Sequence, residues 1–250
     1  MENKLKFQKI IHLKVINSTN LWAWDVYKLE KPFENLVFLA DYQTQGQGMS
    51  GQKWEARKGE NLTFSLLIPQ TLTEATDFFW IDQWVLITLY DTLFFFGIKN
   101  VKIKWPNDLY IQTKKVAGIL IEHRWRGRKT QATVIGIGLN VHQKTWNFLE
   151  ATSLAHWTDQ ILDRQEILTF FLQKMEENFP NTLEKKQNLH QQYLNYLWFY
   201  QNYQNYQISE DQSVKTLKII DVLSNGELVA VDKNNQKYHY KYKELKPLFE

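Results

Sequence analysis

The chain has no cysteine among its 250 residues, so disulfide bonds and thiolate catalysis are both excluded. Its formal net charge is only +3, which gives no support for a nucleic-acid partner. No window approaches the roughly 18 uninterrupted apolar residues of a membrane-spanning helix. The most apolar stretch, residues 78–96, is interrupted by Asp82, Gln83 and Asp91. We therefore expect neither a DNA-binding protein nor a membrane protein.

Signals for export and for several common active sites are missing too. The first ten residues, MENKLKFQKI, lack an apolar core of signal-peptide length, which predicts a cytoplasmic protein. No two of the six histidines have metal-ligand spacing on one helix, so we interpret them as structural. A phosphate-binding loop of the Walker A type is absent, and the residues do not support a Ser-His-Asp triad.

What the chain does contain is enough apolar sequence for a sizeable core. Hydrophobic residues make up 44% of the 250 positions, which allows one large domain or a large and a small one. An apolar run at 74–96 followed by Gly97 predicts a long helix that stops at this glycine. The remaining pattern predicts strands at 10–16, 36–41, 61–68, 101–105, 116–125 and 131–139, and helices at 21–28, 153–159, 163–178 and 181–197.

The pattern changes near residue 200. Residues 201–207 are all Gln, Asn or Tyr, and we interpret them as a polar junction. Three short β runs follow, separated by Ser-Asn-Gly and Asn-Asn turn signals, at 213–222, 227–232 and 236–242. We therefore predict a first domain over 1–200 and a small β-barrel over 208–250.

A glycine-rich loop is the most informative local feature. Residues 40–54, ADYQTQGQGMSGQKW, follow a buried-strand pattern at 36–39. The loop contains Gly46, Gly48 and Gly51 among polar residues. Glycine lets backbone N–H groups approach a ligand closely, and such loops bind anions, usually phosphates.

Five segments in order resemble the biotin protein ligases. They are NSTN at 17–20, the glycine loop ending in Trp54, KWPND at 104–108, KVAGIL at 115–120 and GIGLNV at 136–141. The resemblance implies an α+β fold with two parts. The first is a mixed-sheet, class II synthetase-like biotin/lipoate ligase catalytic domain, and the second is a small C-terminal SH3-like β-barrel. Because the resemblance begins within the first twenty residues, it also implies the short form without an N-terminal DNA-binding domain.

The resemblance implies a two-step ligase reaction. The carboxylate of biotin attacks the α-phosphate of ATP, with Mg²⁺ present, to give biotinyl-5'-AMP and pyrophosphate. A lysine of a biotin carboxyl carrier protein then attacks this mixed anhydride. Two other functions stay open: a lipoate or octanoyl ligase with the same fold, and a non-catalytic module that binds biotin or biotinyl-adenylate. A homodimer through a sheet edge is compatible with the family, whereas neither DNA nor a membrane is an expected partner.

The catalytic candidates are Lys115 and Asp108. Adenylate formation holds two anions together, so it needs a cation between them. By resemblance, Lys115 contacts both the biotin carboxyl and the α-phosphate, although a lysine at this position could also be an ordinary exposed residue at a strand edge. Asp108 follows Pro106-Asn107 in a turn. Its carboxylate can bind Mg²⁺, orient a cation, or form only an Asx-turn.

The binding candidates fall into two groups. Hydroxyl and amide groups can satisfy the two N–H donors and the carbonyl of a ureido ring, and Ser18 and Thr19 are also N-cap candidates. Trp54 matches an aromatic residue that packs on adenine, and Asn140 matches one that bonds its edge. By resemblance, the biotin site comprises Ser18, Thr19, Gln43, Gly46, Gln47, Lys115, Gly118 and Gly138. The adenylate site comprises Gln47, Met49, Trp54, Asn107 and Asn140.

The glycine loop departs from the family in its charge. Many members have arginines in the pattern GRGRxGRxW, where this chain has Gln47, Met49 and Gln52. Arginine is the usual bidentate ligand for phosphate and carboxylate. We therefore expect the loop to hold an anionic intermediate more weakly, unless Lys53 or the Arg57-Lys58 pair supplies the missing charge.

Overall fold

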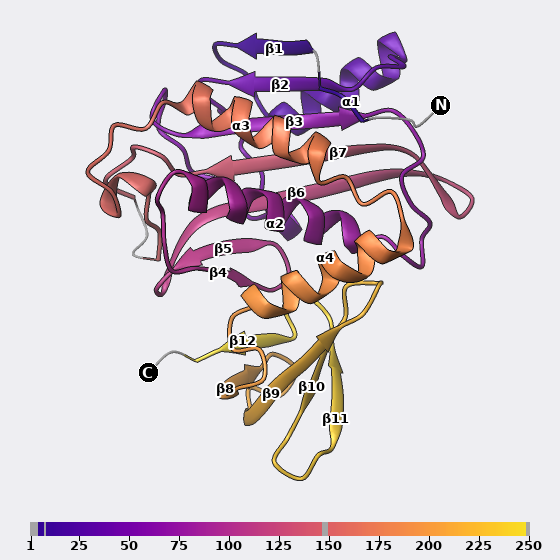
Figure 1. The fold of residues 1–250 in the computed structure, drawn as a ribbon, viewed down its shortest axis with the longest axis vertical. Coiled ribbons are helices and arrows are strands. Elements are labelled where there is room, and N and C mark those ends of the chain that lie inside the picture. The colour runs from indigo at the N-terminus through magenta and orange to yellow at the C-terminus, as the bar shows by residue number, and fades with distance from the viewer. Residues whose placement is uncertain (1–4, 8, 147–149, 249–250) are drawn as a thin grey trace.

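The computed structural model describes residues 5–7, 9–146 and 150–248. A seven-stranded mixed sheet forms the larger part of the molecule, in the order β1-β2-β3-β7-β6-β5-β4 (Figure 1). β1 pairs with β2 in parallel, and the other pairs are antiparallel. The strands are β1 (Lys9–Leu13), β2 (Leu36–Ala40), β3 (Leu62–Ile68), β4 (Val101–Lys104), β5 (Asp108–Ile111), β6 (Lys114–Arg126) and β7 (Lys129–Leu139).

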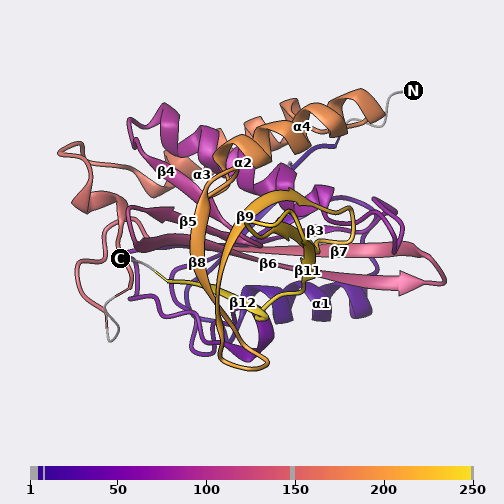
Figure 2. The same cartoon turned by 90° about the horizontal axis from the view of Figure 1, so that it is seen from below.

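Helices cover both faces of this sheet. One face carries α1 (Thr19–Glu30), and the other carries α2 (Trp80–Phe95), α3 (Arg164–Glu177) and α4 (Leu183–Tyr196). Figure 2 shows α1 on the opposite side of the sheet from α2, α3 and α4. The alternation of side chains along a strand separates the two faces. On β3, Phe64 and Leu66 pack into the large core under α2, whereas Leu67 packs into a smaller cluster under α1.

The second helix begins later than its sequence predicts. It ends as expected, because Gly97 follows its last turn with φ 78°, a conformation that glycine adopts without strain. Its first residue is Trp80 rather than residue 74. The preceding residues pair elsewhere: Glu74 forms a β-bridge with Lys129, and the Phe79 N–H donates to the Ser224 carbonyl. Long-range pairing thus removes six residues from the apolar helical pattern.

The C-terminal part is a five-stranded antiparallel sheet below the first (Figure 1), in the order β11-β10-β9-β8-β12. Its strands are β8 (Tyr203–Ile208), β9 (Val214–Val222), β10 (Leu228–Val231), β11 (Lys237–Tyr240) and β12 (Leu245–Pro247). Among the described residues, no pairing joins β11 to β12 and closes the sheet into a barrel.

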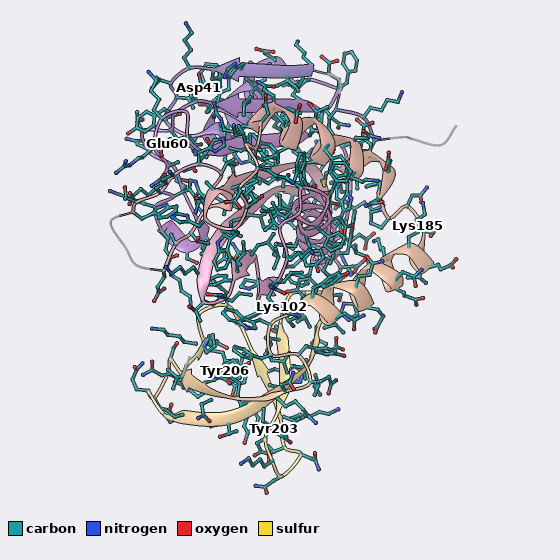
Figure 3. The ribbon with its side chains drawn as sticks, turned by 60° about the vertical axis from the view of Figure 1, so that its left-hand side comes forward. Asp41, Glu60, Lys102, Lys185, Tyr203 and Tyr206 are labelled. Atoms are coloured by element: carbon teal, nitrogen blue, oxygen red, sulfur yellow. The ribbon has the colours of Figure 1, made fainter. Side chains whose placement is uncertain are left out.

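One interpretation of the sequence was wrong, and another was incomplete. Residues 201–207 are not a junction, because β8 pairs with both β9 and β12 and buries Tyr206 and Ile208. Figure 3 shows Tyr203 and Tyr206 on this strand. The turn expected at Asp108 is also incomplete as a description, because Asp108 begins β5, which pairs with β4 and β6. Both strands are short or polar, so neither produces an apolar alternation that a sequence pattern can detect.

The division into domains over 1–200 and 208–250 stays a prediction, and residues 1–4 and 249–250 lie outside the described part. The second sheet begins at Tyr203. Apolar side chains of both sheets and of α4 belong to one continuous core.

The helix expected near 153–159 is a single 3₁₀ turn, Leu154–His156. No helix in the described ranges has both the length and the apolar character needed to cross a membrane.

Candidate functional site

The candidate site lies on the α1 face of the large sheet, where β7 changes from apolar to small side chains. Ala132 and Val134 pack under α1, and the next residues on this face are Gly136 and Gly138. The missing side chains make room for Asn20 above Gly136 and for Trp54 above Gly138, and both residues line a pocket on this face. Its lining includes eleven of the thirteen predicted site residues: Ser18, Thr19, Gln43, Gln47, Met49, Trp54, Asn107, Asp108, Lys115, Gly118 and Gly138.

The remaining two predicted residues line adjoining clefts. Gly46 faces a cleft on the outer side of the glycine loop. Asn140 lines a wider cleft that reaches the second sheet. Trp54 lies where all three meet, because it lines each of them.

An ion pair occupies one end of the pocket. Lys115 Nζ lies 2.6 Å from Asp108 Oδ1, and both side chains are largely buried. Their strands, β5 and β6, are neighbours. A Cβ at Gly118 would lie 3.0 Å from both Asp108 Oδ1 and Lys115 Nζ, so glycine makes room for the pair. The backbone of Lys115 is fixed as well, because its N–H donates to the Glu150 carbonyl at 2.7 Å.

Neutral polar groups occupy the other end. Gln43 follows β2, and its Oε1 accepts from the Thr19 backbone N–H at 2.7 Å and lies 3.0 Å from Thr19 Oγ1. Ser18 is the N-cap residue of α1, but its side chain makes no capping hydrogen bond. Ser18 and Thr19 are nearly fully buried. Their hydroxyls and the Gln43 amide are placed to bind a small neutral polar group.

Trp54 lines the pocket and the wider cleft, and Asn140 lines the wider cleft beside it. The Trp54 ring packs on Gly138, where a Cβ would lie 2.3 Å from Trp54 Cε2. Lys115 Nζ lies 5.6 Å from the centroid of the same ring, within cation–π range. Asn140 donates from Nδ2 to the Thr152 carbonyl at 3.0 Å, while its buried Oδ1 has no hydrogen-bond partner among the described residues. That oxygen is a ready acceptor for a ligand N–H.

The side chain of Asn107 forms a hydrogen bond with the backbone of β6. Its Nδ2 donates to the Ile119 carbonyl at 2.6 Å, and the Ile119 N–H donates back to the Asn107 carbonyl at 3.0 Å. These two bonds tie the KWPND turn to β6 and thereby place Asp108 beside Lys115.

The glycine loop closes on itself. The N–H groups of Gly48 and Trp54 donate to the carbonyls of Gln52 and Gly46, so these two donors are not available to an anion. Gly51 has φ 79°, which glycine adopts without strain.

The cationic side chains in and after the glycine loop are divided between the pocket and the outer cleft. Gln47, Met49 and Gln52 all line the pocket and bring no charge to it, whereas Lys53 also lines it. Of the other two cations expected to compensate, Arg57 and Lys58, both line the outer cleft instead.

Residues 12–140 match the model of the biotin/lipoate A/B protein ligase family. The chain belongs to this family. It is 30% identical over 210 residues to biotin–protein ligase 2 of Arabidopsis thaliana, covering 81% of this chain and 64% of that protein. It is 29% identical over 190 residues to the bifunctional ligase/repressor BirA of Bacillus spizizenii, covering 72% of this chain and 56% of that protein. The chain thus spans about half the length of several relatives it matches.

Solved structures share the fold of this family member. The biotin protein ligase from Aquifex aeolicus in complex with biotin and ATP superposes with a TM-score of 0.75 and 23% identity, over 97% of this chain and 99% of that one. The Helicobacter pylori biotin acetyl coenzyme A carboxylase synthetase with bound biotinylated ATP gives 0.62 and 22%, over 93% and 99%. The fold agrees with the predicted α+β class, including a separate C-terminal sheet.

The residues that the C-terminal sheet contributes to the wider cleft were not anticipated from the sequence. Tyr242 lies between β11 and β12 and lines both the pocket and the cleft. Burial raises the pKa of its hydroxyl, and the charge of Asp108 raises it further. Lys104 and Lys246 also line the cleft, and burial lowers the pKa of Lys104. No local motif marks Tyr242, because its position depends on how the second sheet packs against the first.

Proposed function

We propose that this protein is an ATP-dependent biotin protein ligase, which forms biotinyl-5'-AMP and transfers biotin to a lysine of a biotin carboxyl carrier protein. The observation that carries the proposal is a pocket with the Lys115–Asp108 pair at one end and Ser18, Thr19 and Gln43 at the other. This arrangement suits a ligand with a carboxylate at one end and a neutral urea ring at the other. The names of the relatives and the ligands of the Aquifex structure support the same activity.

In the first step, a carboxylate oxygen of biotin bonds to the α-phosphorus of ATP, and the bond to the bridging oxygen of pyrophosphate breaks. Both reactants are anions, so the barrier includes their repulsion. Lys115 offsets this repulsion from a site where the protein partly excludes water, and there a cation stabilises more strongly than in bulk solvent. Asp108 holds the ammonium in place through its contact of 2.6 Å.

In the second step, the ε-amine of the carrier lysine attacks the acyl carbonyl of the adenylate. The C–O bond to AMP breaks, the nitrogen loses a proton, and AMP leaves with the bonding pair. We assign the adenine to the space beside Trp54 and to the unpartnered Oδ1 of Asn140. We assign the approach of the protein lysine to the wider cleft next to the second sheet.

Mg²⁺ is assigned to the phosphates rather than to a protein cage. Among the described residues, no group of three or more His, Cys, Asp or Glu side chains could hold a metal, and Asp108 is the single carboxylate in the lining of the pocket. Mg²⁺ typically uses one or two carboxylates together with substrate phosphates, and this donor set fits that mode. When bound, the ion neutralises phosphate charge.

Two alternatives and two further assignments remain as proposals. A lipoate or octanoyl ligase is less well matched, because a dithiolane or alkyl chain leaves the polar groups of Thr19 and Gln43 unpaired. A non-catalytic binding module would not need the Lys115–Asp108 pair. A cytoplasmic location and a homodimer through a sheet edge are kept as predictions.

ATP–pyrophosphate exchange tests the proposal directly. The purified chain is incubated with ATP, labelled pyrophosphate and either biotin or lipoate. Exchange that requires biotin is the expected result. Exchange with lipoate alone would assign the chain to the lipoate ligases, and biotin binding without exchange would make it a binding module.

A further inference from the structure

A buried chain of polar side chains runs beneath the neutral end of the pocket. Ser65 on β3 is fully buried, and its Oγ lies 2.6 Å from Thr19 Oγ1 and 2.6 Å from Asn20 Oδ1. Asn20 Nδ2 donates to Glu122 Oε2 at 2.8 Å and to the Leu120 carbonyl at 3.3 Å. Three elements, α1, β3 and β6, therefore meet through side chains that are far apart in sequence.

The protons in this chain can be assigned by counting donors. A carboxylate accepts hydrogen bonds and does not donate them, so Glu122 requires the Nδ2 donor of Asn20 on its side. The amide of Asn20 therefore turns its Oδ1 toward Ser65, and this oxygen is an acceptor too. The single hydroxyl proton of Ser65 therefore goes to Asn20. Ser65 Oγ is left as an acceptor, and the hydroxyl proton of Thr19 goes to it. If Thr19 instead donated to Gln43, 3.0 Å away, Thr19 and Ser65 would hold two oxygens 2.6 Å apart without a proton between them.

We propose that Ser65 is a positioning residue that, with Asn20 and Glu122 behind it, fixes Thr19 Oγ1 as a hydrogen-bond acceptor toward the ligand. The inference rests on the proposed function, because it names the group that this end of the pocket selects: a ring N–H donor, as in a cyclic urea. A dithiolane ring has no N–H and leaves the acceptor unpaired. Gly136 makes room for this chain of hydrogen bonds, since a Cβ there would lie 2.3 Å from Asn20 Oδ1.

The hydrogen bonds of a chain polarise one another, so the loss of one bond weakens the hydrogen bond that the end of the chain makes to the ligand. Ser65→Ala removes only the hydroxyl that takes the proton of Thr19. Thr19 is then free to donate to Gln43 and presents a different arrangement to the ligand. The effect should be confined to the biotin end of the pocket, because the Lys115–Asp108 pair lies at the other end.

A double-mutant cycle tests this proposal, with biotin as the probe and calorimetry without ATP as the measurement. Ser65→Ala should raise the Kd for biotin about tenfold, a typical cost for one buried hydrogen bond, and leave the KM for ATP unchanged. In a Thr19→Val background, Ser65→Ala should cost nothing further, because it acts through Thr19. Thr63→Val is the matched control. It removes a buried hydroxyl from the same face of β3, but one that donates to the Ala40 carbonyl at 3.1 Å.

The outcomes separate this inference from the proposed function. Wild-type affinity in Ser65→Ala, or an equal loss in both backgrounds, overturns the positioning role and leaves the ligase assignment standing. Failure of the wild-type chain to bind biotin sinks the ligase assignment and the positioning role together. If circular dichroism shows that Ser65→Ala does not fold, Glu122→Ala breaks the other end of the chain and enters the same cycle with Thr19→Val. Its effect must likewise vanish in that background.

Discussion

The indole ring of Trp54 packs against Gly138 so closely that a Cβ on that glycine would lie 2.3 Å from the ring. Trp54 belongs to the glycine loop and Gly138 to β7, so this contact joins the loop to the floor of the pocket. The ring also lies near Lys115. The absence of a side chain at Gly138 therefore determines the position of the indole ring.

Gly138→Ala should displace Trp54 while leaving the strand intact, because the backbone of Gly138 is not in the left-handed region. If the indole packs on adenine, the KM for ATP should rise about tenfold, the loss expected for one aromatic contact. Steady-state exchange kinetics measure it. The substitution should have little further effect in a Trp54→Ala background. A similar rise there would show that the methyl group obstructs the ligand itself.

Lys115→Ala should reduce biotin-dependent pyrophosphate exchange by about 100-fold or more, because the cation between two anions is lost. The fold should persist, since the side chain keeps partial contact with solvent. Lys114→Ala is the matched control: it removes an exposed lysine from the preceding position of the same strand. Near-normal exchange in Lys115→Ala would remove this residue from the mechanism.

Asp82 in α2 should make the protein less stable as the pH rises. Burial raises its pKa from 3.8 to about 7. The folded state therefore holds a proton that the unfolded state has released, and stability is lost progressively as the pH rises from about 4 to about 7. Asp82→Asn should unfold at a higher temperature than wild type at pH 8, and the difference should shrink toward pH 4. Part of Asp82 remains accessible to solvent, which reduces the size of the effect.

The comparison must be made at each pH, because His123 acts in the opposite direction. Burial lowers its pKa from 6.5 to about 4, so it destabilises the fold as the pH falls below 6.5. The difference between the variant and wild type cancels this contribution. Asp25→Asn, at an exposed carboxylate on α1, is the control. An equal shift for Asp82→Asn at pH 4 and pH 8 would contradict the raised pKa.

What the sequence could predict was local. The motifs that carry Lys115, Asp108, Thr19 and Gln43 are short and ordered, and eleven of the thirteen residues they suggested line one pocket. Contacts between distant segments were not accessible in this way. Glu122 reaches Asn20 across 102 positions, and no spacing rule connects them.

Contacts between distant segments also limited how much of the fold could be predicted. The interpretation of 201–207 as a junction failed because Tyr206 is the single buried position in this stretch, and its half-buried neighbours Asn205 and Gln207 are polar. The start of α2 was missed because the Phe79 N–H donates to the carbonyl of Ser224, in the turn between β9 and β10. Tyr242 enters the site from that sheet, so it could be found only after the two sheets were placed together.

The glycine loop brings little positive charge to the pocket. Gln47, Met49 and Gln52 line the pocket where many family members carry arginine, and Lys53, from the same loop, lines it as well. A hydrogen bond to a charged group contributes about 1.5–3 kcal/mol against about 1 for a neutral one. Restoring one arginine with Met49→Arg should therefore slow the release of biotinyl-adenylate by roughly tenfold.

The measurement is the dissociation rate of pre-formed biotinyl-adenylate, followed after dilution into unlabelled biotin and ATP. Met49→Leu is the matched control, because it keeps the volume of the side chain and adds no charge. A wild-type loop that releases the adenylate readily would allow it to acylate nearby lysines outside the carrier protein. Should Met49→Arg and Met49→Leu release it at the same rate, positive charge in this loop is not what retains the intermediate. Lys53, which lines the same pocket, would then be the next residue to test.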